Sequence, residues 1–337
     1  MSTIKDVARL TGLSISTISK YINGGNVLEK NRVLIESAIQ KLDFRVNQAA
    51  RSLKTNKTMT VGVLLPSLDV SFFANIITEI EYLLLDAGYF TVVCSYNHDP
   101  RQEMRKLCYL IEKNVDAVLM VPEYLGADEI MKISEIRNHT TPLVLLDRAV
   151  EGLYVDCVMV DNVRAAYQAT CKLIRAGHRR IGIVLGPAEI STARERLQGF
   201  LQAHTELAVA PDPECIRQGD YSLESGHAIF GELMDMPNRP SAVLATNYDM
   251  TLGAVTAAYE RKLRIPEDVS FIGYDEARLS RIISPPIDIV TQPTHEMAEQ
   301  TTALLLERLR SGGDTPKRIR LECGMLSGQS VAPFPAP

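Results

Sequence analysis

Polar side chains directly follow several of the apolar runs that the sequence predicts to be buried strands. Asp147 and Arg148 come after the run LVLL, Asn247 and Asp249 follow a second run, and Asp275 follows a third. Carboxylates accept hydrogen bonds and a guanidinium group donates a planar fork, so this set is suited to hold a polar small molecule. Turn chemistry and helix capping are an alternative role for each of these residues.

The elements that must position these side chains begin near residue 59, where apolar β-rich runs alternate with amphipathic stretches of helical length. Apolar strands separated by helices are typical of parallel sheets covered on both faces. The chain has more strand–helix units than one compact sheet holds, so we expect two doubly wound subdomains. A ligand would then lie in the crevice beyond the carboxyl ends of the strands. The expected strands are 61–65, 91–94, 117–121, 143–146, 157–160, 181–185, 242–245 and 269–272, and the expected helices are 72–87, 102–113, 163–176, 192–204, 223–235 and 250–261.

Three short helices are expected ahead of this core, over residues 3–12, 15–22 and 30–43. Ser14 is a suitable N-cap for the second helix, and glycines follow the first two. Two short helices joined by a tight glycine turn match a helix-turn-helix unit, whose second helix lies in the DNA major groove. Residues 47–53 predict a fourth, very short helix before the polar linker 54–58.

The net charge of the chain changes sign near residue 60, close to the boundary between the short helices and the core. Residues 1–60 contain ten basic and four acidic side chains, a net charge of +6, whereas the other 277 residues carry −11 and the whole chain carries −5. A small cationic segment joined to a large anionic one indicates nucleic-acid contact at one end only.

Several functional classes lack their signatures in this sequence. It has no G-x-G-x-x-G, P-loop, G-x-S-x-G or H-E-x-x-H motif, so we expect neither an enzyme nor a cofactor. Its six cysteines are scattered, with no CxxC pair or Cys/His cluster, so no metal site is expected. No apolar run approaches the roughly 18 residues that cross a bilayer, and the N-terminus lacks a signal-peptide core, so a cytoplasmic protein is expected.

These features together resemble the LacI/GalR (lactose-repressor) family of bacterial transcription regulators. The most specific stretch is TIKDVARLTGLSISTISKYINGG at residues 3–25, which matches the family's DNA-binding signature. Further matches run in order along the chain: LVLLDR at 143–148, RLQGF at 196–200, TNYDMTLGA at 246–254 and IPEDVSFIGYDE at 265–276. The fold that this resemblance implies is an N-terminal all-α helix-turn-helix domain with a hinge helix, followed by an α/β two-subdomain core of the periplasmic-binding-protein type.

The resemblance implies sequence-specific DNA binding through the second helix. Ile15, Ser16 and Lys20 match the family's base readers, and their chemistry suits a thymine methyl, several bases and guanine respectively. Other polar residues of this head are placed for phosphate contacts, which set register without reading sequence. They are Thr3, Ser14, Thr17, Ser19 and Asn23.

The segment 47–53 carries a further implied role. In the family such segments pair across a dimer axis and insert a leucine from each chain into the minor groove, which kinks the DNA. Leu53 matches that leucine. The accompanying hinge residues are Asn47, Ala50, Arg51 and Lys54. An ordinary linker helix is the alternative.

The resemblance also implies a small effector in the core, and a carbohydrate needs the mixture of carboxylate, guanidinium and aromatic groups found there. Arg148 and Arg196 would also suit a sugar acid or a sugar phosphate. An interdomain salt bridge for Arg196 and a loop cap for Asp275 are the alternatives. The expected effector-binding residues are Ser71, Phe73, Asp147, Arg148, Arg196, Tyr221, Asn247 and Asp275.

The sequence thus predicts an effector-controlled regulator, a repressor by resemblance, that binds a pseudo-palindromic operator as a homodimer, with a tetramer as the alternative. A periplasmic-type sugar-binding protein shares the core fold, but the basic head and the missing signal peptide argue against it. The expected domains are residues 1–46, the hinge 47–58 and the core 59–337. Within the core, one subdomain spans 59–161 and 292–323 and the other 162–291 and 324–337. Two departures from the family pattern are Tyr248, where an Asp is usual, and Gly328, where an Arg is usual.

Overall fold

The computed structural model describes residues 2–22, 25–44, 57–137, 141–275, 278–311, 313 and 315–334. The chain divides into two compact units, Met1–Met59 and Thr60–Pro337. Each unit has its own cluster of buried apolar side chains. Within the described residues, no helix has the length and hydropathy needed to span a membrane.

The first unit contains three helices, α1 (Ile4–Thr11), α2 (Ile15–Ile22) and α3 (Glu29–Lys41). Gly12 ends α1 with a φ of 70°, the left-handed conformation that glycine adopts without steric cost. The three helices pack around a small core to which each contributes: Val7, Ile18, Ile35 and Ala38. Partly buried apolar side chains from all three helices pack against this core, and Ile15, Ser16 and Lys20 of α2 are exposed.

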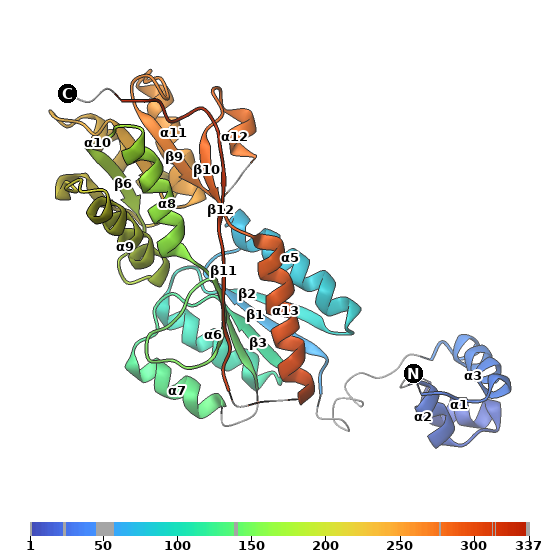
Figure 1. Ribbon diagram of the computed structural model, residues 1–337. Coiled ribbons are helices and arrows are strands. Elements are labelled where there is room, and N and C mark those ends of the chain that lie inside the picture. Colours follow the sequence, from blue (N-terminus) through green and yellow to red (C-terminus); the bar gives the residue numbers. More distant parts are fainter. Residues whose placement is uncertain are drawn as a thin grey trace. The chain divides into compact units, whose positions relative to one another are not determined.

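The second unit consists of two lobes, each built on a six-stranded sheet (Figure 1). Lobe 1 has the strand order β11-β5-β4-β3-β1-β2, with every pairing parallel. Helices α5 and α13 lie side by side on one face of the sheet, and α6 and α7 cover the other (Figure 1). The elements of lobe 1 are β1 (Thr60–Leu65), α5 (Ser71–Asp86), β2 (Phe90–Ser95), α6 (Pro100–Glu112), β3 (Ala117–Met120), α7 (Ala127–Arg137), β4 (Leu143–Leu146), β5 (Asp156–Val160), α13 (Thr294–Ser311) and β11 (Arg318–Leu321).

Lobe 2 has the strand order β12-β10-β9-β8-β6-β7. Helices α8 and α9 pack on one face of the sheet and α10 and α11 on the other, each pair over its own apolar cluster. Its elements are α8 (Asn162–Arg175), β6 (Ile181–Leu185), α9 (Ser191–Glu206), a 3-10 turn (Pro213–Cys215), β7 (Ile216–Gln218), α10 (Leu223–Met234), β8 (Ala242–Ala245), α11 (Tyr248–Glu260), β9 (Ser270–Tyr274), α12 (Leu279–Ile282), β10 (Asp288–Thr291) and β12 (Gly324–Leu326). These two lobes and the helical head confirm the expected fold class.

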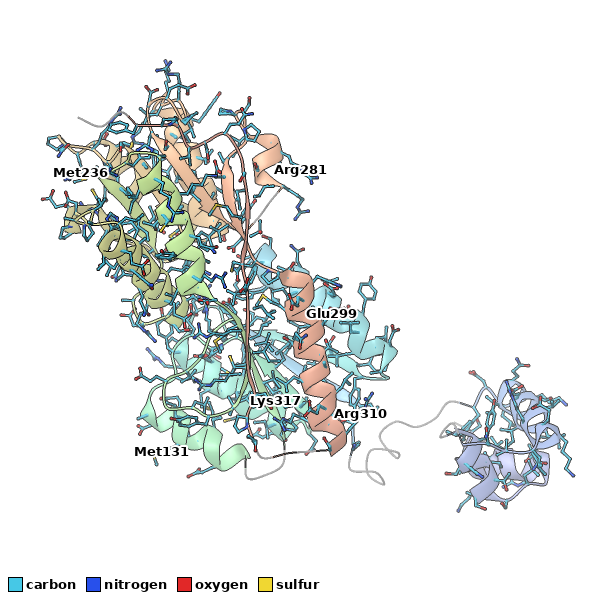
Figure 2. The ribbon with its side chains drawn as sticks, viewed as in Figure 1. Met131, Met236, Arg281, Glu299, Arg310 and Lys317 are labelled. Carbon is cyan, nitrogen blue, oxygen red and sulfur yellow. The ribbon has the colours of Figure 1, made fainter. Side chains whose placement is uncertain are left out.

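The chain passes between the lobes three times. It enters lobe 2 between β5 and α8, returns to lobe 1 between β10 and α13, and crosses again between β11 and β12. Figure 2 shows the long helix that follows the second crossing, α13, with the exposed side chains of Glu299 and Arg310 along it. These three connections bring the carboxyl ends of the strands of both sheets toward the space between the lobes.

The sequence prediction of strands needs three corrections. The strand β2 is not covered on both faces, because it is the edge of its sheet, and Phe90 and Val92 are 65% and 45% exposed. The sheet of lobe 2 is not wholly parallel, since β12 runs antiparallel to β10. Four strands were not predicted, because β7, β10, β11 and β12 are three or four residues long and carry charged or small side chains.

Gly328, where the family usually has Arg, lies against the backbone of a neighbouring loop. A Cβ built on it would lie 2.3 Å from the carbonyl oxygen of Pro286 and 2.5 Å from the carbonyl carbon of Ile287. No side chain fits at that distance. The close approach of these two backbone segments therefore explains why this chain has glycine, and not arginine, at position 328.

Candidate functional site

A cleft of about 530 Å³ lies between the two lobes, at the carboxyl ends of strands from both sheets. Its size falls within the range of small-molecule sites. Lobe 1 contributes side chains that follow β1, β2, β3 and β4, and lobe 2 contributes side chains that follow β6, β7, β8, β9 and β10. The lining residues are Asp69, Val70, Phe72, Phe73, His98, Glu123, Tyr124, Asp147, Arg148, Pro187, Thr192, Arg196, Asp220, Tyr221, Ser222, Leu223, Glu224, Asn247, Tyr248, Asp249, Asp275 and Gln292.

Two carboxylates occupy equivalent positions in the two lobes. Asp147 follows β4 and its amide donates to Val158 O of the next strand at 2.8 Å, and Asp275 follows β9 and donates to Val290 O at 2.8 Å. Both have left-handed backbones, with φ of 67° and 73°, as does Tyr221 at 68°. Such conformations cost about 1–3 kcal/mol for residues other than glycine and cluster at functional sites. The fold therefore holds these three cleft residues in conformations that are unfavourable on their own.

Arg196 is buried in the wall of lobe 2 with its donors directed at neighbouring oxygens. Its Nε donates to Asn162 Oδ1 at 2.9 Å, and a second nitrogen donates to the carbonyl of Thr246. Its guanidinium group lies 4.8 Å from the centre of the Tyr274 ring. The side chain is thus fixed by contacts within its own lobe, and the described residues form no interdomain salt bridge with it, which was the alternative considered from the sequence.

Arg148 is the buried cation of lobe 1. Its Nε lies 3.5 Å from Asp147 Oδ2, and its Nη1 lies 3.5 Å from Glu123 Oε1. The guanidinium carbon is 5.8 Å from the centre of the Phe73 ring and 6.0 Å from that of Tyr221, so aromatic rings from both lobes border it. These contacts are long, which leaves Arg148 available for a shorter hydrogen bond to a ligand.

Asp275 is placed both to bind a ligand and to cap a loop, the two roles considered for it from the sequence. Its Oδ2 accepts from the amide of Tyr248 at the start of α11 (3.1 Å), and its Oδ1 accepts from Gln292 Nε2 (2.6 Å). It caps a helix and also lines the cleft. Burial raises the pKa of Asp275, and burial likewise raises the pKa values of Asp147 and Asp249.

Three buried polar atoms on the cleft walls have no hydrogen-bond partner within the described part of the chain. They are Asp147 Oδ1, Arg148 Nε and Gln292 Oε1. A buried polar group without a partner costs about 1–3 kcal/mol. Two acceptors and one donor are thus in place for a ligand that both donates and accepts hydrogen bonds. No group of three His, Cys, Asp or Glu side chains that could hold a metal ion occurs among the residues described.

The cleft brings together seven of the eight residues expected from the sequence, all except Ser71, whose neighbours Val70 and Phe72 line the wall instead. Tyr221 and Asn247 also contact each other, because Asn247 Nδ2 donates to Tyr221 O at 2.9 Å. The sequence analysis missed lining residues that follow expected strands and were open to the same argument, namely His98, Glu123 and Tyr124. It also missed Gln292, which follows the unpredicted strand β10, and Thr192, which lies in the first turn of α9.

In the helical head, Ser14 forms the expected cap. The amide of Thr17 donates to Ser14 Oγ at 3.2 Å, and Ser14 Oγ also contacts the hydroxyls of Ser16 and Thr17 at 2.8 Å. Ile15, Ser16 and Lys20 are exposed on α2, with Ile15 45% exposed. Ile15 lies outside the apolar core found among the described residues of the head.

An open hollow of about 560 Å³ borders α2. It is lined by Ser16, Thr17 and Lys20 and, from the loop before α3 and from α3 itself, by Asn26, Val27, Leu28 and Asn31. The hydroxyl of Thr3 donates to Asp6 Oδ2 at 2.8 Å at the start of α1, and Ser19 is partly buried. The expected contacts at Asn23, Asn47, Ala50, Arg51, Leu53 and Lys54 fall outside the described residues.

Comparison with known families and solved structures identifies relatives of both units. The family profile described as bacterial regulatory proteins, lacI family, matches residues 3–47, and that described as periplasmic binding protein-like domain matches residues 170–331. Among solved structures, a transcriptional regulator CelR–cellobiose complex is 29% identical, with a TM-score of 0.74 over 98% of this chain and 100% of that one. A Lac repressor dimer bound to operator and the anti-inducer ONPF shares the fold, with a TM-score of 0.87 at 22% identity over 98% of this chain and 99% of that one.

Two curated relatives extend the similarity to almost the full chain. The HTH-type transcriptional repressor PurR of Proteus mirabilis (strain HI4320) is 34% identical over 339 residues, which cover 99% of this chain and 98% of that protein. The protein of the same name from Klebsiella pneumoniae (strain 342) is 34% identical over 338 residues, with the same coverage. The chain therefore belongs to the lacI family of bacterial regulatory proteins, as a DNA-binding transcriptional regulator rather than an enzyme.

Proposed function

We propose that this protein is a dimeric repressor that binds a pseudo-palindromic operator and is controlled by a neutral carbohydrate in the interlobe cleft. The observation that carries the proposal is the cleft itself, in which two buried guanidinium groups, buried carboxylates and aromatic rings from both lobes face one space. Two related regulators were solved with sugars, one with cellobiose and one, from Enterococcus faecium, with ribose. The latter is 26% identical, with a TM-score of 0.72 over 82% of this chain.

The charge of the cleft favours a neutral ligand over a sugar acid or phosphate. Seven carboxylates line it, against two guanidinium groups and one imidazole. An anionic ligand would meet net repulsion, whereas hydroxyl groups donate to carboxylates and accept from Arg148 and Arg196. The unpartnered acceptors Asp147 Oδ1 and Gln292 Oε1 are suited to such hydroxyl donors. The ring faces of Phe73 and Tyr221 suit the apolar side of a sugar ring.

Base reading is proposed for the exposed side chains of α2. Lys20 donates to guanine, Ser16 bonds to base edges, and Ile15 packs on a thymine methyl, which accounts for its exposure. Thr3, Ser14, Thr17 and Ser19 contact phosphates. Asn23 also contacts a phosphate. The minor-groove hinge is proposed to consist of Asn47, Ala50, Arg51, Leu53 and Lys54.

The exposed apolar face of lobe 1 supports the homodimer. Phe90 and Val92, which share one face of the edge strand β2, are exposed, and so are Tyr82 and Leu85 of the adjacent α5. Contiguous apolar faces mark interaction sites, and a two-fold operator calls for a two-fold protein. Val92→Asp is expected to shift the mass in solution from dimer to monomer by light scattering, and an unchanged dimer would place the interface elsewhere.

The DNA proposal is tested with the full chain by selecting duplexes from a random pool and measuring their binding by fluorescence anisotropy. Specific binding is expected to fall steeply with salt. Lys20→Ala should weaken it about 5- to 150-fold, the equivalent of about 1–3 kcal/mol for a base contact. Lys41→Ala, an exposed lysine at the end of α3, is the matched control. A pool without enrichment, or equal losses in the two variants, would contradict the proposal.

The effector proposal is tested by thermal shift of the full chain with neutral sugars, sugar acids and sugar phosphates, because a bound ligand raises the melting temperature by mass action. A neutral sugar is expected to produce the shift, and Arg196→Ala and Asp275→Asn to abolish it. A shift produced only by the acids or phosphates would overturn the assignment of a neutral effector.

A further inference from the structure

A second cavity of about 290 Å³ adjoins the cleft. Three loops form it: the loop after β3, the loop after β4 and the loop between β6 and α9. It shares Glu123, Tyr124 and Arg148 with the cleft, so these three side chains stand at the boundary between the two spaces. Of the effector-binding residues expected from the sequence, Arg148 alone lines this cavity.

The buried guanidinium group of Arg148 lies at the boundary between the cleft and the second cavity. Arg148 is 6% exposed, and its Nε has no hydrogen-bond partner within the described residues. Because Arg148 lines both spaces, a ligand that reaches from one to the other passes directly beside its guanidinium group. An ether or hydroxyl oxygen at that point would accept a hydrogen bond from this donor.

The other walls of the second cavity offer both donors and acceptors. Ser191 at the start of α9 and the exposed Glu151 after β4 line it. Arg194 also lines it and donates to Ala188 O at 3.1 Å, which holds the β6–α9 loop in place. The charges are mixed, so this cavity suits hydroxyl groups better than an anion.

We propose that the second cavity is a subsite for another sugar ring, so that the effector is a linear glycoside of at least two rings whose linkage lies beside Arg148. This inference rests on the proposed carbohydrate effector and adds its length. One ring lies between Phe73 and Tyr221 in the cleft, and the next lies against Tyr124 and Ser191. A single ring leaves the second cavity to water.

The test compares sugars of different length on the full chain by titration calorimetry. The probes are the monosaccharides glucose, galactose and ribose and the disaccharides cellobiose, maltose and lactose. At least one disaccharide is expected to bind 10-fold or more tightly than its component monosaccharides. Ser191→Trp fills the second cavity and is expected to remove this preference while leaving monosaccharide affinity unchanged, which also shows that the variant is folded. Ser191→Ala removes the hydroxyl but adds no bulk, so the preference should become smaller without being lost.

The outcomes separate the two proposals. If monosaccharides bind as tightly as disaccharides, or if Ser191→Trp keeps the preference for the disaccharide, the subsite is wrong and the carbohydrate effector stands. If none of the six sugars binds, the carbohydrate effector itself is overturned, and the subsite with it.

Discussion

Asp275 in the cleft accepts a 2.6 Å hydrogen bond from Gln292, the residue that directly follows β10 where the chain returns to lobe 1. A matching contact holds another connection between the lobes. Arg196 donates to Asn162 at 2.9 Å, and Asn162 begins α8 where the chain first enters lobe 2. Two of the three interlobe connections are thus hydrogen-bonded to cleft side chains. A ligand that engages Asp275 and Arg196 acts on residues that already hold the segments joining the lobes.

Gln292→Leu tests this coupling, because it keeps the approximate size of the side chain and removes the hydrogen bond to Asp275. Ligand affinity is expected to fall about 10-fold, since a hydrogen bond to a charged group contributes about 1.5–3 kcal/mol, part of which water replaces. The change in DNA affinity that ligand causes should shrink as well. Calorimetry and anisotropy measure the two effects. Gln202→Leu removes an exposed bond to Glu206 and is the control; equal effects in the two variants would exclude a special role for Gln292.

The raised pKa values in the cleft predict that ligand affinity falls on acidification. Burial raises the pKa values of Asp147 and Asp275, so both carboxylates take up protons at a higher pH than an exposed aspartate. A protonated carboxyl loses acceptor capacity toward a sugar hydroxyl, so affinity should decline on acidification at a higher pH than that at which exposed aspartates titrate. Asp147→Asn, which tolerates the left-handed backbone, should weaken binding at pH 7 and flatten this decline. An affinity that rises on acidification would contradict the assigned role.

The cleft could be predicted from the sequence better than its surroundings, for a physical reason. Polar residues directly after apolar strands, such as Asp147 and Asp275, must converge once parallel sheets form. The second cavity could not be predicted in this way, because Ser191 and Glu151 come together only through the conformations of three loops. The periodicity of the sequence also could not predict that side chains of β2 are exposed. Phe90 and Val92 belong to an apolar run that suits a central strand, and only the strand order makes it an edge.

Glu103 predicts a pH dependence of stability that is separate from the cleft carboxylates. It is fully buried on α6 and accepts hydrogen bonds from the amides of Glu123 and Tyr124 at 2.8 and 3.1 Å, which positions the loop between the two cavities. Burial raises the pKa of Glu103 from 4.5 to about 6. A carboxyl with a raised folded-state pKa contributes stability below its unfolded pKa and loses it as the pH rises through the folded one.

The wild-type protein should therefore lose about 2 kcal/mol relative to Glu103→Gln between about pH 3 and pH 7, since one pKa unit corresponds to 1.36 kcal/mol. Chemical denaturation of both proteins across this range measures the difference. A constant difference in the free energy of unfolding would mean that Glu103 has the same pKa in the folded and unfolded chains.

The ion pair between Arg308 of α13 and Asp156 of β5 predicts a large loss of stability when one partner is substituted. Two guanidinium nitrogens of Arg308 donate to the two carboxylate oxygens of Asp156 at 2.6 and 2.8 Å, and both side chains are 8% exposed. Removal of one partner leaves the other charge buried and unpaired. Arg308→Ala should therefore cost about 3–5 kcal/mol in unfolding experiments.

The double variant Asp156→Leu with Arg308→Met tests the physical reason for that loss, because it removes both charges and fills the space with apolar atoms. It should be more stable than either single variant, since no unpaired charge remains. Lys317→Ala breaks the neighbouring ion pair with Glu307, in which both side chains are more than 40% exposed, and should cost less than about 1 kcal/mol. If Arg308→Ala cost no more than Lys317→Ala, the position of α13 on the sheet would depend on its apolar contacts alone.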